Sequence, residues 1–332
     1  MGQKSRLSHL SRKYSDGRGG AARTIIHRWQ LISQLLVFLG VLGIRAPHIR
    51  DTPMWAIALF VQTRLCEGIK PGHLRNMMSA IRVILDEAGR GIVNTACSND
   101  ALGVPRRNRK GAHRAQTHAE FAQTIERARA IDEGLAHLLF LMFYLGLRSI
   151  EALRSARELP GWLALLRAGA DRLPFQYGAK TNRYREIEII RGLRAQTIHA
   201  IESALAYCQA HNDLRTARSR LRDWLYAAGI RGQLSSHSLR YSHAVNLALA
   251  LLDEGVSPAK TLDRVSASLG HGARAQMILN TYLQEIRHRF ASVVIPRRIP
   301  RKPAKTVVGR HLPGPQRMIR SNRRMKFKGI KV

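Results

Sequence analysis

The chain has 332 residues, 45% of them hydrophobic, which is enough apolar material for two domains with buried cores and excludes a mostly disordered protein. Its 55 lysine and arginine residues outnumber 22 aspartate and glutamate residues, and the net charge of +33 favours a polyanionic partner, nucleic acid first. A membrane surface is the competing polyanion. The longest apolar stretches, around Leu31–Ile44 and Leu135–Leu147, fall short of the roughly 20 residues that span a bilayer, so we interpret both as core helices.

The amino-terminal part predicts a small helical domain at residues 23–98, after a basic segment at residues 1–22 that shows no secretory signal. Apolar residues recur at helical spacing in three segments, which glycine and proline separate: Thr24–Gly40, Met54–Gly68 and Pro71–Gly89. Three widely spaced cysteines form neither a disulfide framework nor a zinc pattern, which fits a reducing cytoplasm.

A basic linker at residues 99–116 follows, and a second domain is predicted at residues 117–290. Thr117 and Glu120 form a capping box at its first helix, and "RLPFQYGAKTNRYREIEII" predicts a β-hairpin with its turn near Thr181–Asn182. Helices surround the hairpin, so the expected fold class is mainly α with a small β-hairpin (α+β). Residues 291–332 form a basic tail that we expect to be flexible.

Arg148 ends a strongly apolar run, "LLFLMFYLGL", where a guanidinium needs an anion because an unpaired charge in low dielectric is costly. Glu151, one helical turn on, offers an ordinary ion pair, so Arg148 taken alone favours a structural role. Further on, "SSHSLRYSHAVNLALALL" predicts a helix whose first turn places His237 and Arg240 on one face. Cations are poorly placed at a helix amino terminus, and this indicates an anion bound between them.

A third unusual stretch, "ASLGHGARAQMILNTYL", predicts a tight turn in which Gly270 and Gly272 flank His271. An amphipathic helix then carries Tyr282. A tyrosine on such a helix is more often a core residue than a catalyst, so Tyr282 by itself indicates no reaction.

Taken in order, "GLRSIEAL", "GAKTNRYREIEI", "HSLR", "LGH" and a final tyrosine resemble the tyrosine recombinase (phage integrase) family over about residues 117–290. The helical segment before the linker resembles the family's core-binding domain more loosely, and together the two imply a two-domain clamp around duplex DNA. The resemblance implies six catalytic residues: Arg148, Lys180, His237, Arg240, His271 and Tyr282. Eleven positions separate His271 from Tyr282, somewhat more than the family usually has. Tyr282 is still preferred, because Tyr241 falls inside the "HSLR" helix and no tyrosine follows Tyr282.

The implied chemistry is DNA strand exchange through a covalent phosphotyrosyl link to Tyr282. Two arginines, Arg148 and Arg240, would grip the phosphate oxygens, and Lys180 would protonate the departing 5′ oxygen. Either His237 or His271 would take the tyrosine proton, with His237 favoured. No carboxylate cluster or Cys/His set suggests a metal, so we expect neither metal nor cofactor. Six other basic residues are expected to contact backbone phosphates or to be solvated: Arg106, Arg107, Arg109, Lys110, Arg183 and Arg185.

Three functions remain open at this point. The first is a site-specific recombinase, such as the integrase of a phage or integrative element, acting in the cytoplasm on double-stranded DNA as a tetramer on two sites. The second keeps the chemistry in a cellular resolvase or a DNA-relaxing enzyme, which differ in whether paired specific sites are needed. The third is a DNA-binding protein on a catalytically dead recombinase scaffold, which the presence of every catalytic residue type disfavours.

Overall fold

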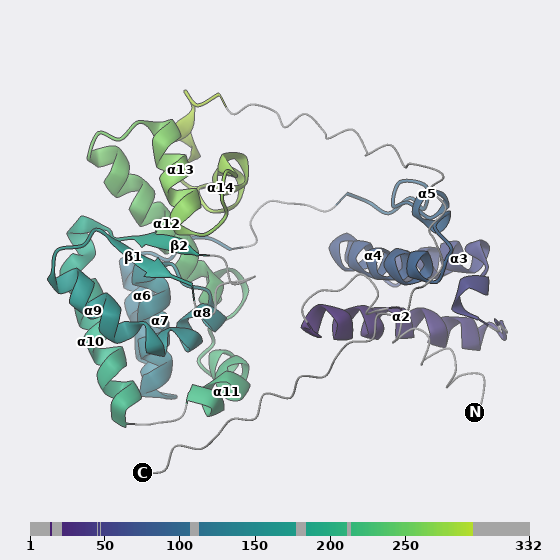
Figure 1. Ribbon diagram of the computed structural model, residues 1–332, viewed down its shortest axis with the longest axis horizontal. Coiled ribbons are helices and arrows are strands. Elements are labelled where there is room, and N and C mark those ends of the chain that lie inside the picture. Colours follow the sequence, from purple (N-terminus) through teal and green to yellow (C-terminus); the bar gives the residue numbers. More distant parts are fainter. Residues whose placement is uncertain are drawn as a thin grey trace, which may run out of the picture.

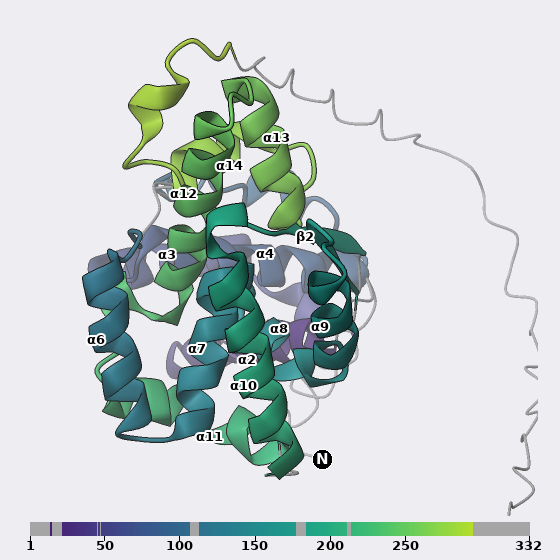
Figure 2. The same cartoon turned by 90° about the vertical axis from the view of Figure 1, so that its left-hand side faces the viewer.

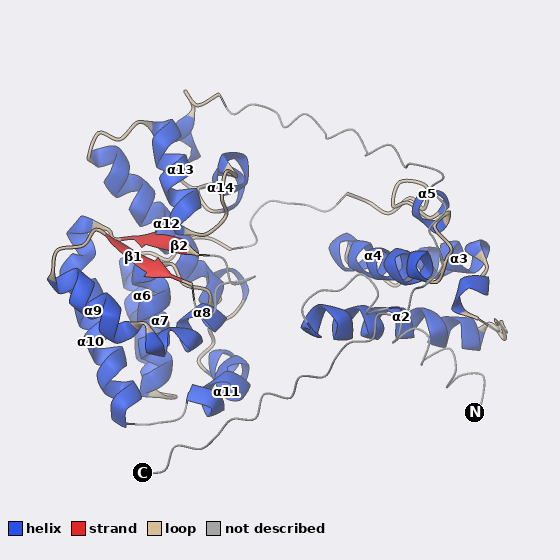
Figure 3. Cartoon of the chain, in the orientation of Figure 1, coloured by secondary structure: helices blue, strands red, loops and turns tan. Residues whose placement is uncertain are grey.

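The computed structural model describes residues 14, 22–44, 46, 48–106, 113–176, 184–210 and 214–294 (Figure 1). These residues form two bodies with separate hydrophobic cores, one before and one after the linker. Their secondary structure is mainly helical with one small antiparallel sheet (Figure 3), which confirms the expected fold class. The exact domain boundaries stay predictions, and the basic tail from residue 295 onward lies outside the described residues.

The amino-terminal body packs three long helices where the apolar spacing predicts them. They are α2 (Ala22–Val41), α3 (Met54–Cys66) and α4 (Pro71–Glu87), and the short α5 (Val93–Ala96) follows. Pro71 occupies the first turn of α4, where its missing N–H leaves no helical hydrogen bond unmade. The buried faces of these helices are aliphatic. Ile32 of α2, Ile57 of α3 and Ile81 of α4 are fully buried in one shared core.

The carboxyl-terminal body begins with α6 (His118–Arg129), and the expected capping box is present. The Glu120 N–H donates to Thr117 Oγ1 at 3.2 Å, and the Thr117 N–H donates to Glu120 Oε2 at 2.9 Å. The apolar α7 (Glu133–Leu145) is central and packs against α6, α10 and α12 (Figure 2). The remaining helices are α8 (Ser149–Arg154), α9 (Leu159–Arg167), α10 (Arg194–Ala210), α11 (Leu214–Ala227), α12 (Ser236–Asp253), α13 (Pro258–Ser268) and α14 (Ala275–Thr281).

The predicted hairpin strands are present as β1 (Arg172–Phe175) and β2 (Arg185–Glu188). They pair antiparallel, with Leu173 opposite Ile187 and Phe175 opposite Arg185. The turn between them, with Thr181–Asn182 and Lys180, lies outside the described residues. The helix α13, which leads into the turn around His271, packs on β2.

Among the described helices, Thr24–Val41 within α2 is long and apolar enough to cross a membrane by length and composition. Its inward residues, including Leu31, Ile32, Leu35 and Leu39, are buried in the amino-terminal core. The pair Glu133–Leu145 and Ser149–Arg157 passes the same test only jointly, and the two helices are bent by 113° at the break. The buried leucines of α7 fit its interpretation as a core helix, whereas the apolar window of α2 is 22% buried and exposes Val37 and Val41.

Two glycine turns shape the surroundings of the predicted site. Gly146, with φ +60°, ends α7 and turns the chain sharply into α8. Gly270 and Gly272, with φ +68° and +61°, flank His271 as predicted. Glycine adopts this left-handed backbone without the clash that a Cβ causes, so these turns hold Arg148 and His271 at fixed places.

Candidate active site

Glu151 lies at the centre of a buried charge cluster. It is in the first turn of α8, and its side chain is fully buried. Its carboxylate accepts hydrogen bonds from the backbone N–H of Arg148 at 2.9 Å and from Arg148 Nη1 at 2.5 Å. The ordinary ion pair that the sequence offered for Arg148 therefore exists, but Glu151 has further partners.

Arg185 is the second partner of Glu151, and its position corrects an expectation. Its Nη1 and Nη2 donate to Glu151 Oε1 and Oε2 at 3.1 and 2.8 Å, and its guanidinium lies 4.8 Å from the centre of the Phe175 ring. Only 7% of Arg185 is exposed, so the expectation of a solvated charge is wrong, while a contact with a DNA phosphate stays a prediction. The cause is strand alternation, which turns Arg185 and Ile187 to the same buried face of β2.

Arg240 on α12 completes the cluster and is fully buried. Its Nη1 lies 3.8 Å from Glu151 Oε2, and its Nη1 and Nη2 donate to the backbone carbonyls of Gly146 and Leu269 at the two glycine turns. Burial lowers the pKa of Arg240 to about 10, which still leaves it charged at neutral pH.

Three guanidinium groups thus surround one carboxylate. Burial by itself raises the pKa of Glu151, but the hydrogen bonds and charge of Arg185, with the charges of Arg148 and Arg240, bring it down to about 2. Glu151 is therefore ionised, and the cluster still has more positive than negative charge. A bound anion would neutralise the excess.

The Tyr282 hydroxyl reaches this cluster from the residue that follows α14. Its oxygen lies 3.2 Å from His271 Nε2 and 3.5 Å from Arg240 Nε. The ring of Tyr241 packs 4.6 Å from that of Tyr282, and burial raises the pKa of Tyr241 to about 12. Of the two tyrosines, Tyr282 is the one whose hydroxyl lies within reach of both a cation and a base.

His237 and His271 both contact Tyr282. Burial, assisted by the charge of Arg240, lowers the pKa of His237 to about 4 and that of His271 to about 3. Both rings are therefore neutral near pH 7 and have a nitrogen lone pair that accepts a proton. His271 is within hydrogen-bond distance of the Tyr282 hydroxyl, whereas the His237 ring centre lies 6.2 Å from the Tyr282 ring centre.

A cavity of about 730 Å³ opens beside the cluster, and Arg148, Arg185 and His271 contribute to its wall. The charged residues that line it are mostly basic: Arg148, Arg172, Arg185, Arg264 and Arg274 with Glu186 and Glu188. The cavity therefore offers room for an anion at the place where the cluster has surplus positive charge.

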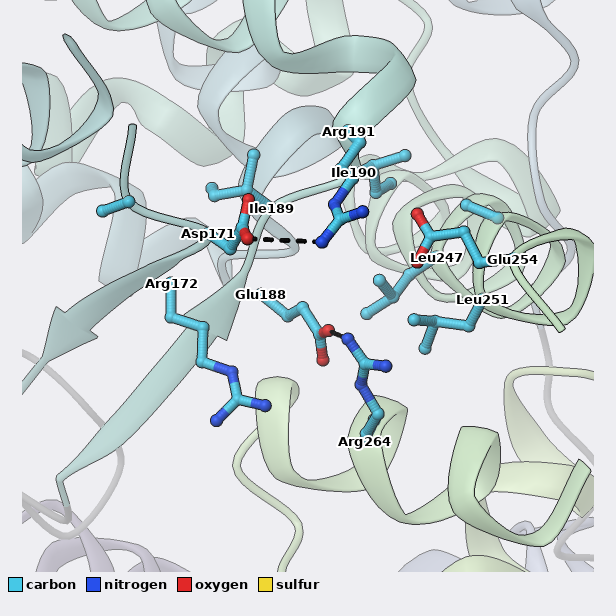
Figure 4. Close-up of a pocket in the computed structure, with 12 residues that line it drawn as sticks. Asp171, Arg172, Glu188, Ile189, Ile190, Arg191, Leu247, Leu251, Glu254 and Arg264 are labelled. Carbon is cyan, nitrogen blue, oxygen red and sulfur yellow. Dashed lines mark hydrogen bonds and ion pairs between the residues drawn. The ribbon is translucent and has the colours of Figure 1, made fainter. Parts of the chain in front are cut away.

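A second cavity, of about 480 Å³, has a different charge balance (Figure 4). There Glu188 contacts Arg264, and Asp171 faces Arg191 at 3.5 Å. Acidic and basic side chains are equal in number in its lining, which has Asp171, Glu188 and Glu254 with Arg172, Arg191 and Arg264, so this cavity has no comparable surplus charge. It is the weaker candidate for an anion site.

The structure brings five of the six expected catalytic residues together: Arg148, His237, Arg240, His271 and Tyr282. The sixth, Lys180, lies outside the described residues, as do Arg107, Arg109, Lys110 and Arg183, while Arg106 is exposed. Within the part of the chain that is described, no three His, Cys, Asp or Glu side chains are grouped to hold a metal ion, and the expected absence of metal and cofactor stays a prediction.

Two residues near the site do not follow from the motifs in the sequence. Arg185 is expected among the solvated or phosphate-contacting residues, although its alternation with Ile187 along the strand indicates burial. His113 was not singled out at all, and its ring lies 5.4 Å from that of His237. No local pattern marks His113, because the residues it contacts are more than a hundred positions away along the chain.

Two family models match the chain, "Phage integrase, N-terminal" over residues 4–94 and "Integrase" over residues 103–246. Among solved structures, a lambda integrase dimer bound to a COC' core site shares the fold, with a TM-score of 0.52 and 15% identity over 88% of this chain and 79% of that one. XerA recombinase is 16% identical over 88% of this chain and 100% of that one, with a TM-score of 0.33. Among curated proteins, no sequence match is found. The two models and the clustered motif residues show that the chain belongs to the tyrosine recombinase (phage integrase) family.

Proposed function

We propose that this chain is a site-specific DNA recombinase that breaks and rejoins DNA strands through a 3′-phosphotyrosyl link to Tyr282. The observation that carries the proposal is the position of the Tyr282 hydroxyl, which lies between Arg240 and His271 at the edge of a cluster with surplus positive charge. A tyrosine oxygen between a cation and a base is arranged to attack a phosphate.

In this proposal the anion that the cluster lacks is the scissile DNA phosphate. The side chain of Arg148 is 23% exposed and borders the cavity, while two backbone carbonyls fix Arg240 behind it. Planar guanidinium groups grip two phosphate oxygens each as negative charge builds up in the transition state. Glu151 holds Arg148 in place, and Arg185 shares the charge of Glu151 so that Arg148 is not fully neutralised.

Cleavage requires that one proton leaves Tyr282 and that another reaches the departing oxygen. His271 Nε2 accepts the Tyr282 proton as the tyrosine oxygen bonds to phosphorus, and this geometry favours His271 over the His237 that the sequence favoured. The bond from phosphorus to the 5′ oxygen then breaks. We assign the proton for that oxygen to Lys180 on the family resemblance alone. The 5′ hydroxyl of another strand reverses these steps, so strand exchange needs no external energy source.

Double-stranded DNA is the proposed partner, and a tetramer on two DNA sites is the proposed assembly. The net charge of +33 supports a polyanionic partner, and the lambda integrase of similar fold was solved as a dimer on its DNA core site. Integration or excision of a mobile element is the proposed role. The basic residues Arg106, Arg107, Arg109, Lys110 and Arg183 are proposed to contact backbone phosphates.

A nicked DNA substrate tests the chemistry, because the short leaving strand diffuses away and traps the covalent intermediate. We expect a protein–DNA adduct that survives denaturation and maps to Tyr282 by peptide analysis. Tyr282→Phe removes one oxygen and little volume, so the adduct should vanish while DNA affinity stays close to that of the native chain. Tyr226→Phe is the matched control, since Tyr226 is 67% exposed and should leave the adduct intact.

Attachment of the DNA to Tyr241 would show that Tyr282, with its long spacing from His271, is not the nucleophile. Absence of any adduct on cognate DNA would favour a DNA-binding protein on a dead scaffold. Relaxation of supercoiled DNA without paired specific sites would favour a relaxing enzyme over a recombinase.

A further inference from the structure

We propose that His113, at the end of the interdomain linker, is a positioning residue that orients the ring of His237, one of the six residues that the family resemblance implies to be catalytic. This inference rests on the proposed function, and it adds a residue that lies 124 positions from the side chain it serves. The His237 ring contacts the rings of His113, Tyr241 and Tyr282.

Ring contacts hold His237. Among the residues that the structure describes, none makes a hydrogen bond with its two ring nitrogens. The His237 ring instead meets the edges of His113 and Tyr241, with ring centres 5.4 and 5.7 Å apart and ring planes 79° and 77° apart. Edge-to-face contacts of this kind are attractive and orient a ring without occupying its nitrogens.

His113 is itself held in place by the loop before α12. Its Nδ1 lies 3.1 Å from the carbonyl oxygen of Gly232 and 3.2 Å from Ser235 Oγ. A carbonyl oxygen only accepts, so Nδ1 carries the hydrogen and donates it. The ring of His113 is therefore fixed to the same loop that leads into the helix carrying His237.

The residues after His113 anchor this part of the linker to the catalytic elements. The backbone N–H of Gln116 donates to Ser242 Oγ at 2.7 Å, and its side-chain amide donates to Ser238 Oγ at 2.8 Å. The backbone N–H of Ala115 donates to Glu285, three residues beyond Tyr282, at 2.9 Å. His113 is thus the first described residue of a segment that is attached to both α12 and the tyrosine segment.

Single-turnover cleavage of the nicked substrate at saturating enzyme tests the role of His113. His113→Ala should slow adduct formation about three- to tenfold, the range expected for the loss of ring-edge contacts, while DNA affinity stays within about twofold. His113→Phe keeps a ring edge and should restore most of the lost rate. His118→Ala, which removes an exposed histidine five positions on, is the matched control and should have no such effect.

A double-mutant cycle separates positioning from a general structural role. In a His237→Ala background, His113→Ala should cost nothing further, because the ring that it positions is gone. An additive loss in that background, or a His113→Phe variant as slow as His113→Ala, would overturn the inference while leaving the Tyr282 chemistry intact.

A measurement that needs no cleavage completes the test. In the free protein with labelled histidine, the imidazole resonances of His237 should shift or broaden on His113→Ala but not on His118→Ala. Unchanged His237 resonances would overturn the inference even if the chain proved unable to cleave DNA. A native chain that forms no adduct at all would count against the proposed function and not against this packing.

Discussion

The two bodies of the chain differ in what they bury. Among the described residues of the amino-terminal body, the buried side chains are apolar except for Thr52. The carboxyl-terminal body has an aliphatic core too, yet it also buries Glu151, Arg185, Arg240 and His243. The second body therefore contains groups that a core built only for stability would leave out.

This difference indicates which body carries the chemistry. Burying a charge removes its hydration, and the attraction of an ion pair offsets that free-energy cost only in part. Buried charges are therefore weak evidence of stability. Three cations around one carboxylate also leave a net positive charge. Such a cluster supports the proposed binding of an anion, whereas the buried side chains described in the amino-terminal body form an aliphatic core.

Removing the central carboxylate is expected to give the largest effect. Glu151→Ala leaves Arg185 and Arg240 buried without their partner and should lower the free energy of unfolding of the carboxyl-terminal body by about 3–5 kcal/mol. Glu67→Ala in the amino-terminal body breaks a partly exposed pair with Arg64 and should cost under about 1 kcal/mol. Urea denaturation of both variants measures the contrast. Equal losses would mean that the two bodies do not differ in the way we describe.

Acid should destabilise the carboxyl-terminal body selectively. Burial and the charge of Arg240 lower the pKa of His243 to about 3, so between that value and its ordinary 6.5 the unfolded chain binds a proton that the folded body does not. The free energy of unfolding of the carboxyl-terminal body should therefore decrease as the pH falls below 6.5. His243 alone should lower it by about 3 kcal/mol at pH 4. Glu151, with its pKa of about 2, adds a further loss below the ordinary glutamate pKa.

Tryptophan fluorescence distinguishes the bodies in this experiment, because Trp29 and Trp55 lie in one body and Trp162 and Trp224 in the other. Variants with Phe at Trp29 and Trp55 report the carboxyl-terminal body alone. A transition in that body that does not weaken between pH 7 and pH 4 would show that His243 is not held neutral by burial.

The smallest expected effect concerns the glycine turn beside the cluster. At Gly270 an added Cβ would lie 2.9 Å from Arg185 Cδ, and φ is +68°, so Gly270→Ala should cost about 1–3 kcal/mol. Gly255 has a similar φ of +79° with no atom within 4 Å of an added Cβ. Gly255→Ala therefore shows the backbone strain alone, and thermal unfolding of the two variants isolates the contact with Arg185. If Gly270→Ala lowers the stability no more than Gly255→Ala does, the Arg185 side chain moves away from the added Cβ without cost.

The sequence by itself determined the local features of this protein. The helices of the amino-terminal body follow from apolar residues at helical spacing, and the Thr117–Glu120 capping box fixes the start of α6 from residues three positions apart. The turn around His271 follows from its flanking glycines. Five motif residues were also found, because their types and order resemble a family. Each of these signals lies within a few neighbouring residues, where backbone sterics and periodicity act directly.

The tertiary structure decided which residues distant in the sequence contact one another. Glu151 meets Arg185 across 34 positions and Arg240 across 89, and His113 meets His237 across 124. Nothing within any one segment specifies these distances, because they depend on how the helices and the hairpin pack. The sequence therefore predicted that Arg148 needs an anion and that Glu151 is near it. Only the tertiary contacts of Glu151 with β2 and α12 showed that two more buried arginines share that carboxylate and leave the cluster with surplus positive charge.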